Sequence, residues 1–382
     1  MAEEALAKVD KICQERDSRA KELKGEGKKV VGYFCAYVPA EILTAAGLVP
    51  YRITGNINEP ISKADAYVET IMCPFVRNCF DKAIRGEYSF LNGFIVPHSC
   101  DNVVKIYDIW KYNLKPEYSH FLNVPHTTTK ASMEFFKAEL GTFKKSIEDL
   151  VGREISSGEL NDAIKLHNEQ RALIKELYEF RKQDPPLISG SEVMKTMVAI
   201  SKIPVQDSND LLKGVISDIK GRSSSPFAKL PRLMIYGPEI DDVPFIEMVE
   251  ETGANVVIDD ICLGTKSHWW DVEITPDPLD GIAEAYLDKI NCSRTYRQRW
   301  GTRDEDLDSR FGYLRRFAQD YNVNGVFLYI IKYCDNYEFD AIDIKDYLEK
   351  AGFPGLVVEG DYTAMSIEWL KTRVQAFLEM VS

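Results

Sequence analysis

Residues 92–101 read NGFIVPHSCD, and residues 324–335 read NGVFLYIIKYCD. Each stretch begins with Asn-Gly, continues through an apolar run and ends on Cys-Asp, although the second is two residues longer. Short apolar runs bounded by turn residues are typical of buried strands in parallel sheets. The two stretches therefore predict two similar strands, each followed closely by a cysteine.

The sequence around these two stretches alternates between predicted strands and predicted helices. Strands are predicted at 30–34, 48–53, 92–97, 118–124, 232–236, 255–258, 326–331 and 355–358. Helices are predicted at 2–23, 39–46, 73–84, 130–150, 158–182, 191–200, 209–219, 244–252, 280–290, 344–351 and 363–380. Alternation of this kind favours an α/β fold, with parallel sheets covered by helices on both faces.

A domain boundary is predicted in residues 221–231, GRSSSPFAKLP, which are rich in small and turn residues. The first domain would comprise residues 1–225, with an N-terminal helix and a helical insertion. The second would comprise residues 226–382. The fold class is therefore two α/β domains with parallel sheets, preceded by a helix.

Charge and hydropathy exclude several classes of partner. The 382 residues carry a formal net charge of −13, which argues against nucleic acid or an anionic membrane as the main partner. No apolar run approaches the ~20 residues of a membrane helix. The polar N-terminus, MAEEALAKVDKICQERD, does not resemble a signal peptide. These features predict a soluble cytoplasmic protein.

The chain has eight cysteines, and in a large cytoplasmic protein they are not expected to form structural disulfides. Four of them, Cys35, Cys100, Cys262 and Cys334, follow predicted strands. Because parallel sheets bind ligands at the carboxyl ends of their strands, thiols from both domains could face each other across the cleft. Eight separate buried thiols remain the alternative, and Cys13, on the N-terminal helix, is expected to serve only in packing.

Thiolates without imidazole partners indicate an iron–sulfur cluster if a metal is bound. The chain has no C-x-x-C pair and no His at zinc-site spacing, which argues against structural zinc. Scattered thiols suit iron–sulfur ligation. Cys73 and Cys79 are six residues apart and do not share a helix face, so they would serve different irons, or only one of them would bind.

Other catalytic motifs are absent. The chain has no phosphate-binding loop, no G-x-G-x-x-G after a strand and no G-x-S-x-G elbow. His98, at a strand end, and Glu41, in the first turn of a predicted helix, are candidate proton donors. The structural alternatives are a hydrogen-bonded His98 and a Glu41 that only favours its helix N-terminus.

Several longer segments resemble a known family. YFCAYVPAEILTAAGLVPYRITG at 33–55 and CPFVRNCFDKAIRGEYSFLNGFIVPHSCD at 73–101 are similar to 2-hydroxyacyl-CoA dehydratase and benzoyl-CoA reductase subunits. The resemblance continues through KYCD at 332–335 and the C-terminal VVEGDYTAMSIEWLKTRVQAFLEM, and covers nearly the whole chain.

The resemblance implies an iron–sulfur cluster in the interdomain cleft, with ligands matching Cys73, Cys100 and Cys334. It also implies a separate ATP-hydrolysing iron–sulfur partner that donates low-potential electrons. A branch of the family joins two 4Fe–4S cubanes into a double-cubane cluster, with three thiolates for each cubane. The ligand set predicted on this basis has six members: Cys35, Cys73, Cys79, Cys100, Cys292 and Cys334. Cys262 is the alternative to Cys292.

Three functions follow as hypotheses. The first is a homodimeric reductase of small molecules that uses the double-cubane cluster, with His98 and Glu41 as proton donors. The second is one subunit of a heterodimeric 2-hydroxyacyl-CoA dehydratase or benzoyl-CoA reductase with a single 4Fe–4S cluster. The third is a non-catalytic electron-transfer subunit.

Overall fold

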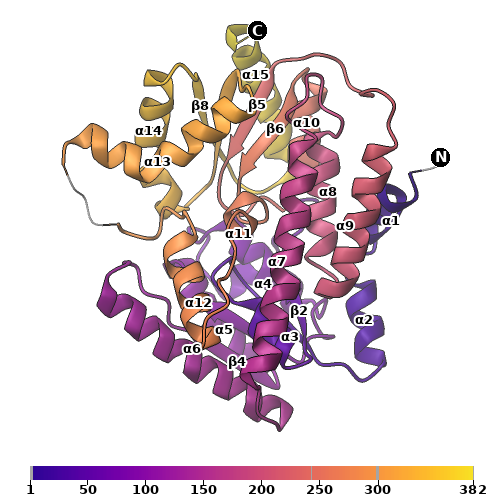
Figure 1. Ribbon diagram of the computed structural model, residues 1–382, viewed down its shortest axis with the longest axis vertical. Helices are drawn as coiled ribbons and strands as arrows, with labels where there is room; N and C mark the ends of the chain where they lie inside the picture. The colour runs from indigo at the N-terminus through magenta and orange to yellow at the C-terminus, as the bar shows by residue number, and fades with distance from the viewer. Residues whose placement is uncertain (1–2, 242, 298–300, 382) are drawn as a thin grey trace.

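The computed structural model describes residues 3–241, 243–297 and 301–381, and Figure 1 traces the chain through them. Residue 2, where the first helix was predicted to begin, lies outside the described residues. Among the described helices, none combines the length and the apolar composition that a membrane span requires.

The first half of the chain forms a sheet of four parallel strands, in the order β2-β1-β3-β4. Val31 in the central strand lies opposite Pro50 on one side and Gly93 on the other. The strands are β1 (Val30–Tyr33), β2 (Val49–Arg52), β3 (Gly93–Pro97) and β4 (Tyr118–Leu122).

The second half repeats this topology, with four parallel strands in the order β6-β5-β7-β8. These strands are β5 (Arg232–Tyr236), β6 (Asn255–Asp260), β7 (Gly325–Ile331) and β8 (Gly355–Gly360). In Figure 1 this sheet lies above the first one. The predicted α/β fold with two parallel sheets is therefore confirmed.

The two Asn-Gly sequences play the same structural part in the two sheets. The Asn92 side chain accepts a hydrogen bond from the Val30 amide, and the Asn324 side chain accepts one from the Arg232 amide. Each asparagine thus joins the start of β3 or β7 to the start of the neighbouring central strand. The repeated sequence therefore marks structurally equivalent positions.

This topology places the strand-end cysteines at two facing switch points. From β1 the chain moves to β2 on one side and later to β3 on the other, so the order reverses between β1 and β3. Cys35 follows β1, and Cys100 follows β3. Cys334 follows β7 in the equivalent place of the second sheet. Ligands of open parallel sheets bind at such reversals.

Helices cover both sheets, and several pack across the predicted boundary. In Figure 1, α7, α8 and α9 form a layer of long helices beside the sheets. α8 packs against α10 and β6 of the second half, while α12 returns to pack on α6 of the first. The boundary near residue 225 stays a prediction. The helices are α1 (Glu4–Gln14), α2 (Ser18–Gly25), α3 (Ala40–Ala45), α4 (Pro74–Ile84), α5 (Asp101–Leu114), α6 (Lys130–Val151), α7 (Ser157–Glu179), α8 (Gly190–Ile200), α9 (Val205–Lys220), α10 (Val243–Glu251), α11 (Thr265–His268), α12 (Pro278–Glu284), α13 (Arg303–Asp320), α14 (Asp335–Lys350) and α15 (Ala364–Val381), with short turns at η1 (Ala64–Ala66) and η2 (Ala285–Lys289).

The predicted helices differ from the observed ones in several places, and the short helix α11 was also not predicted. The predicted helix at 2–23 is divided into α1 and α2, and the one at 280–290 becomes α12 followed by a π-helical turn. α5 and α13 were not predicted, and α14 begins nine residues before its predicted start at 344. Acidic residues dilute the apolar stripe of α13 and α14, which explains why their periodicity was not recognised.

Candidate metal centre

Three of the predicted ligands lie at helix N-termini. Cys73, Cys100 and Cys334 are the residues immediately before α4, α5 and α14. Burial raises the pKa of Cys73 to about 11 and that of Cys100 to about 12, while amide N–H groups of the first helical turn act in the opposite direction. Such N–H groups, together with the helix dipole, stabilise a thiolate once a cation compensates for its burial.

Reciprocal hydrogen bonds hold the two Cys-Asp segments together. Each segment continues with an asparagine, and Asn102 donates to the Tyr333 carbonyl at 3.5 Å, while Asn336 donates to the Ser99 carbonyl at 3.4 Å. Asn102 also accepts a hydrogen bond from the Cys73 amide at 3.1 Å. The segments that carry Cys100 and Cys334 are therefore fixed against each other across the cleft.

A second group of thiols comprises Cys35, Cys262 and Cys292. The hydroxyl of Tyr337 lies 3.8 Å from the Cys262 sulfur and 4.0 Å from the Cys292 sulfur. Burial raises the pKa of Cys262 well above its usual range, and the nearby Cys35 and Cys292 thiols raise it further. One tyrosine hydroxyl thus contacts two of the three sulfurs.

The two groups of three are close enough to influence each other. Burial raises the pKa of Cys334, and the charges of Cys73, Cys100 and Cys262 raise it further. Burial likewise raises the pKa of Cys100, with a further contribution from Cys35. Six thiols from both halves of the chain therefore form one connected arrangement, called here the thiol cluster: Cys35, Cys73, Cys100, Cys262, Cys292 and Cys334.

The structure does not bring Cys79 to the thiol cluster. Cys79 is fully buried within α4. Burial raises the pKa of its thiol, and the negative charge of Asp241 raises it further. Its own charge acts on Tyr51 and Tyr88, with which it shares a hydrophobic core. A ligand role for Cys79 stays a prediction, and Cys262, the predicted alternative to Cys292, lies near both Cys35 and Cys292. The remaining thiol, Cys13, donates to the Lys195 carbonyl at 3.2 Å, which agrees with a packing role.

Within the described residues, the thiols are not arranged as the ligands of one metal ion. In the described part of the chain, no three His, Cys, Asp or Glu side chains converge as one ion would require. Thiolates of an iron–sulfur cluster bind different irons and are therefore spread apart. A metal-bound thiol is deprotonated even where burial alone would keep it neutral.

The backbone at the thiol cluster includes two left-handed residues other than glycine. Cys35 has φ +61°, and Tyr333, next to Cys334, has φ +64°. This conformation costs about 1 kcal/mol or more for such residues and is found preferentially at functional sites. Both positions directly orient a thiol of the cluster.

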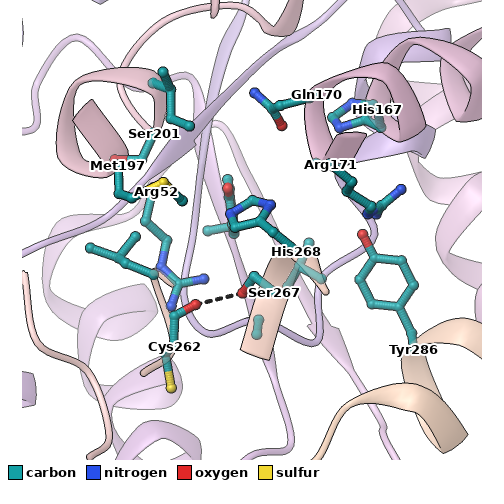
Figure 2. A pocket seen from close by; sticks show the side chains of 16 residues that line it. Arg52, His167, Gln170, Arg171, Met197, Ser201, Cys262, Ser267, His268 and Tyr286 are labelled. Atoms are coloured by element: carbon teal, nitrogen blue, oxygen red, sulfur yellow. Dashed lines mark hydrogen bonds between the residues drawn. The ribbon is translucent and has the colours of Figure 1, made fainter. Parts of the chain in front are cut away.

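A small cavity of about 90 Å³ adjoins Cys262. Figure 2 shows Arg52, His268 and Arg171 around it, with the Ser267 hydroxyl bonded to the Cys262 carbonyl. Its walls come from β1, β2, α7, α8 and the segment after β6. The lining residues are Tyr33, Ala36, Val38, Ala40, Arg52, His167, Gln170, Arg171, Met197, Ile200, Ser201, Cys262, Leu263, Ser267, His268 and Tyr286.

Arg52 connects this cavity with the thiol cluster. It is 3% exposed and forms an ion pair with Glu239, which lies three residues after the end of β5. Burial raises the pKa of Cys35, and the positive charge of Arg52 opposes that increase. Arg52 therefore favours the thiolate form of the neighbouring cysteine.

Of the two predicted proton donors, only Glu41 contacts residues that line the cavity. Glu41 is fully buried and accepts hydrogen bonds from Arg171 at 2.6 Å and Tyr286 at 2.7 Å. Burial disfavours its ionised form, but Arg171, His167 and the hydrogen bonds outweigh this effect and lower its pKa to about 2. A carboxyl group with this pKa is ionised at neutral pH and carries no proton to donate. Its contacts instead favour a role in anchoring Arg171.

His98 lies at the end of β3 and faces the end of β4. Its Nδ1 is 3.4 Å from the Asn123 side chain, and its ring packs edge-on against His126. It does not belong to the cavity lining. Proton donation by His98 or Glu41 therefore stays a prediction.

Sequence reasoning missed several residues that line the cavity. His167 and Arg171 are four residues apart on α7, a spacing that places them on one helix face. This spacing was the feature of the sequence that could have identified the two residues as neighbours in one site. Nothing in the sequence indicated that α7 would lie against Arg52, or that Tyr337 would reach Cys262 and Cys292.

Comparison with known proteins identifies relatives over nearly the full chain. YjiM of Escherichia coli (strain K12), described as a putative dehydratase subunit, is 28% identical over 94% of this chain and 93% of its own length. The beta subunit of (R)-phenyllactyl-CoA dehydratase from Clostridium sporogenes is 24% identical over 94% and 93%, respectively. A subunit of benzoyl-CoA reductase from Thauera aromatica is 25% identical over 81% and 79%.

The family model described as 2-hydroxyglutaryl-CoA dehydratase, D-component, matches residues 35–381. This range contains all six members of the thiol cluster and every described strand except β1, which ends two residues before it. The resemblance noted in the sequence is thereby confirmed: the chain belongs to the 2-hydroxyglutaryl-CoA dehydratase D-component family.

Proposed function

We propose that the thiol cluster holds a double-cubane iron–sulfur centre, and that the protein is a homodimeric reductase of small molecules. Electrons would come from a separate ATP-hydrolysing iron–sulfur protein, since this chain has no phosphate-binding loop of its own. When bound, the centre would supply low-potential electrons to a molecule beside it.

The observation that carries the proposal is the grouping of the six thiols into two sets of three. Cys73, Cys100 and Cys334 lie at helix N-termini, and Cys35, Cys262 and Cys292 lie around Arg52 and Tyr337. Three thiolates for each 4Fe–4S unit leave one further position on each for a bridge. A single 4Fe–4S cluster would leave the second set of thiols without a ligand role.

The surroundings of the thiol cluster would influence its reduction potential. Iron–sulfur potentials depend on burial, net charge and hydrogen bonds to sulfur. Six thiolates in a buried cleft disfavour added negative charge, which lowers the potential. A strong donor, such as a partner that couples electron transfer to ATP hydrolysis, would then be required.

Anaerobic purification with chemical analysis of iron and acid-labile sulfide tests the proposal. We expect about eight irons per chain, four for each 4Fe–4S unit. About four irons per chain would contradict the double cubane and favour a single cluster. Absence of both iron and sulfide after reconstitution would favour separate buried thiols.

Tyr337 should tune the potential of the centre. We expect Tyr337→Phe to lower the midpoint potential by about 20–60 mV, since a hydrogen bond to sulfur is worth about 0.5–1.5 kcal/mol and stabilises the more negative reduced state. A redox titration followed by electron paramagnetic resonance measures this shift. Tyr347→Phe on the same helix is the control, because its hydroxyl bonds Asp308. Equal potentials in all three proteins would refute a role for Tyr337.

The second candidate function is participation in a heterodimeric 2-hydroxyacyl-CoA dehydratase or benzoyl-CoA reductase. Two relatives favour it, because one is the beta subunit of (R)-phenyllactyl-CoA dehydratase and the other is a subunit of benzoyl-CoA reductase. In this case Cys73, Cys100 and Cys334 alone would bind a 4Fe–4S cluster. The chain would then purify as a heterodimer with about four irons in each cluster.

A further inference from the structure

The cavity beside Cys262 has charged side chains of one sign only. Arg52 and Arg171, each 3% exposed, are the ionised groups among its described lining residues, and no carboxylate lines it. Their partners Glu239 and Glu41 lie behind them, outside the lining. The lining itself is therefore cationic, and carboxylates behind it balance the charge of each arginine.

Both arginines retain hydrogen-bonding capacity. The Nε of Arg52 and the Nε of Arg171 are buried, and within the described part of the chain neither has a hydrogen-bond partner. A buried donor without a partner costs about 1–3 kcal/mol, which a bound acceptor would recover. In Figure 2 the ring of His268 lies between the two guanidinium groups.

The two histidines add neutral hydrogen-bonding groups. Burial lowers the pKa of His167 to about 4 and that of His268 to about 3, with the charge of Arg171 also acting against protonation of both. A neutral imidazole can donate one hydrogen bond and accept another. Gln170 and Ser201 also line the cavity, where Gln170 donates to the Ser208 hydroxyl and the Ser201 hydroxyl donates to the Val198 carbonyl.

The volume of the cavity limits the size of its ligand. A water-sized group needs about 10–15 Å³ of such volume, so the cavity has room for about six to nine of them. Pockets for drug-sized ligands enclose about 300–1,000 Å³. The acyl-CoA molecules in the names of the relatives are far larger than this space.

We propose that this cavity binds a compact anion, a small carboxylate or oxyanion, next to Cys262. The inference goes beyond the proposed function and does not depend on it, because it is argued from the lining of the cavity alone. The unpartnered Nε atoms of the two guanidinium groups supply charged donors, and the neutral ring of His268 can donate a further hydrogen bond. The cavity is too small to enclose an acyl-CoA molecule.

Calorimetric titration of the anaerobically purified protein tests the proposal, with acetate, its neutral isostere acetamide, and acetyl-CoA as probes. We expect acetate to bind at least about tenfold more tightly than acetamide, which corresponds to about 1.4 kcal/mol. Acetamide binding as tightly as acetate, acetyl-CoA binding better than either, or no binding of acetate would each overturn the proposal.

Adding a carboxylate to the lining gives a second test. Gln170→Glu retains a bond to Ser208, whose hydroxyl can donate to the new carboxylate, and should weaken acetate binding at least about tenfold through charge repulsion. Ser201→Asp should act similarly if Gln170→Glu fails to fold. Gln375→Glu, on the exposed face of α15, adds the same charge far from the lining and is the control. Unchanged acetate binding in the folded lining variants would contradict the site.

The iron content of the same preparations separates the two proposals. A protein with its full iron content but no preference for acetate would refute the anion site and leave the reductase proposal standing. A protein without iron that still binds acetate in preference to acetamide would refute the reductase proposal alone.

Discussion

Cys334→Ala and Cys262→Ala are each expected to remove most of the visible iron–sulfur absorbance and to reduce activity by about a hundredfold or more. Loss of a supporting residue around a metal already costs about 10–100-fold, and loss of a direct ligand costs more. The two cysteines belong to different sets of three, so each substitution would disrupt one half of the centre. Iron analysis and the visible spectrum measure the effect.

Cys79→Ala is the matched control for these variants. Cys79 is as deeply buried as any cysteine in the described chain, but it lies within α4 and faces tyrosines. Its removal is expected to cost packing energy and to leave the iron content unchanged. Loss of iron in Cys79→Ala together with full iron in Cys262→Ala would restore the ligand set predicted from the sequence and contradict the one proposed from the structure.

Glu41→Ala is expected to destabilise the protein by about 3–5 kcal/mol, the range found when one partner of a buried ion pair is removed. Arg171 would lose its buried partner, and Tyr286 would lose its acceptor. Chemical denaturation of the anaerobic protein measures the change. Glu134→Gln breaks an exposed pair with Lys130, and should cost less than about 1 kcal/mol. Similar losses in both variants would contradict a special role for Glu41.

The same carboxylate predicts a loss of stability in acid. The pKa of Glu41 is about 2 in the folded protein against an ordinary value of 4.5, so its contribution is complete above pH 4.5 and disappears as the pH falls towards 2. This contribution is roughly 3 kcal/mol. His167 and His268, whose pKa values are lowered to about 4 and about 3, also destabilise the fold as the pH falls below 6.5. Glu41→Gln should lose less stability than the unmodified protein between pH 4.5 and 2.

The amino-acid sequence was sufficient for the strands of both sheets and for the position of four thiols after strands, namely Cys35, Cys100, Cys262 and Cys334. Hydrophobic runs ending in Cys-Asp locate β3 and β7, because a buried parallel strand needs continuous apolar residues and its carboxyl end meets the next helix. These properties depend only on residues that are neighbours in the sequence, so the sequence alone reveals them. The apolar positions of α5, Val103, Ile106 and Trp110, had helical spacing and could also have been recognised.

The sequence by itself determined the two-sheet α/β fold, the family and the chemistry of the donor set. Only the tertiary structure decided which cysteines meet, since this depends on how α4 is rotated and how α12 crosses back over α6. That rotation turns Cys79 towards Tyr51 and Tyr88, and the segment after β6 brings Cys262 to the cleft. The cationic cavity has the same origin, because Arg52 and Arg171 are distant in sequence and converge only when α7 packs beside the first sheet.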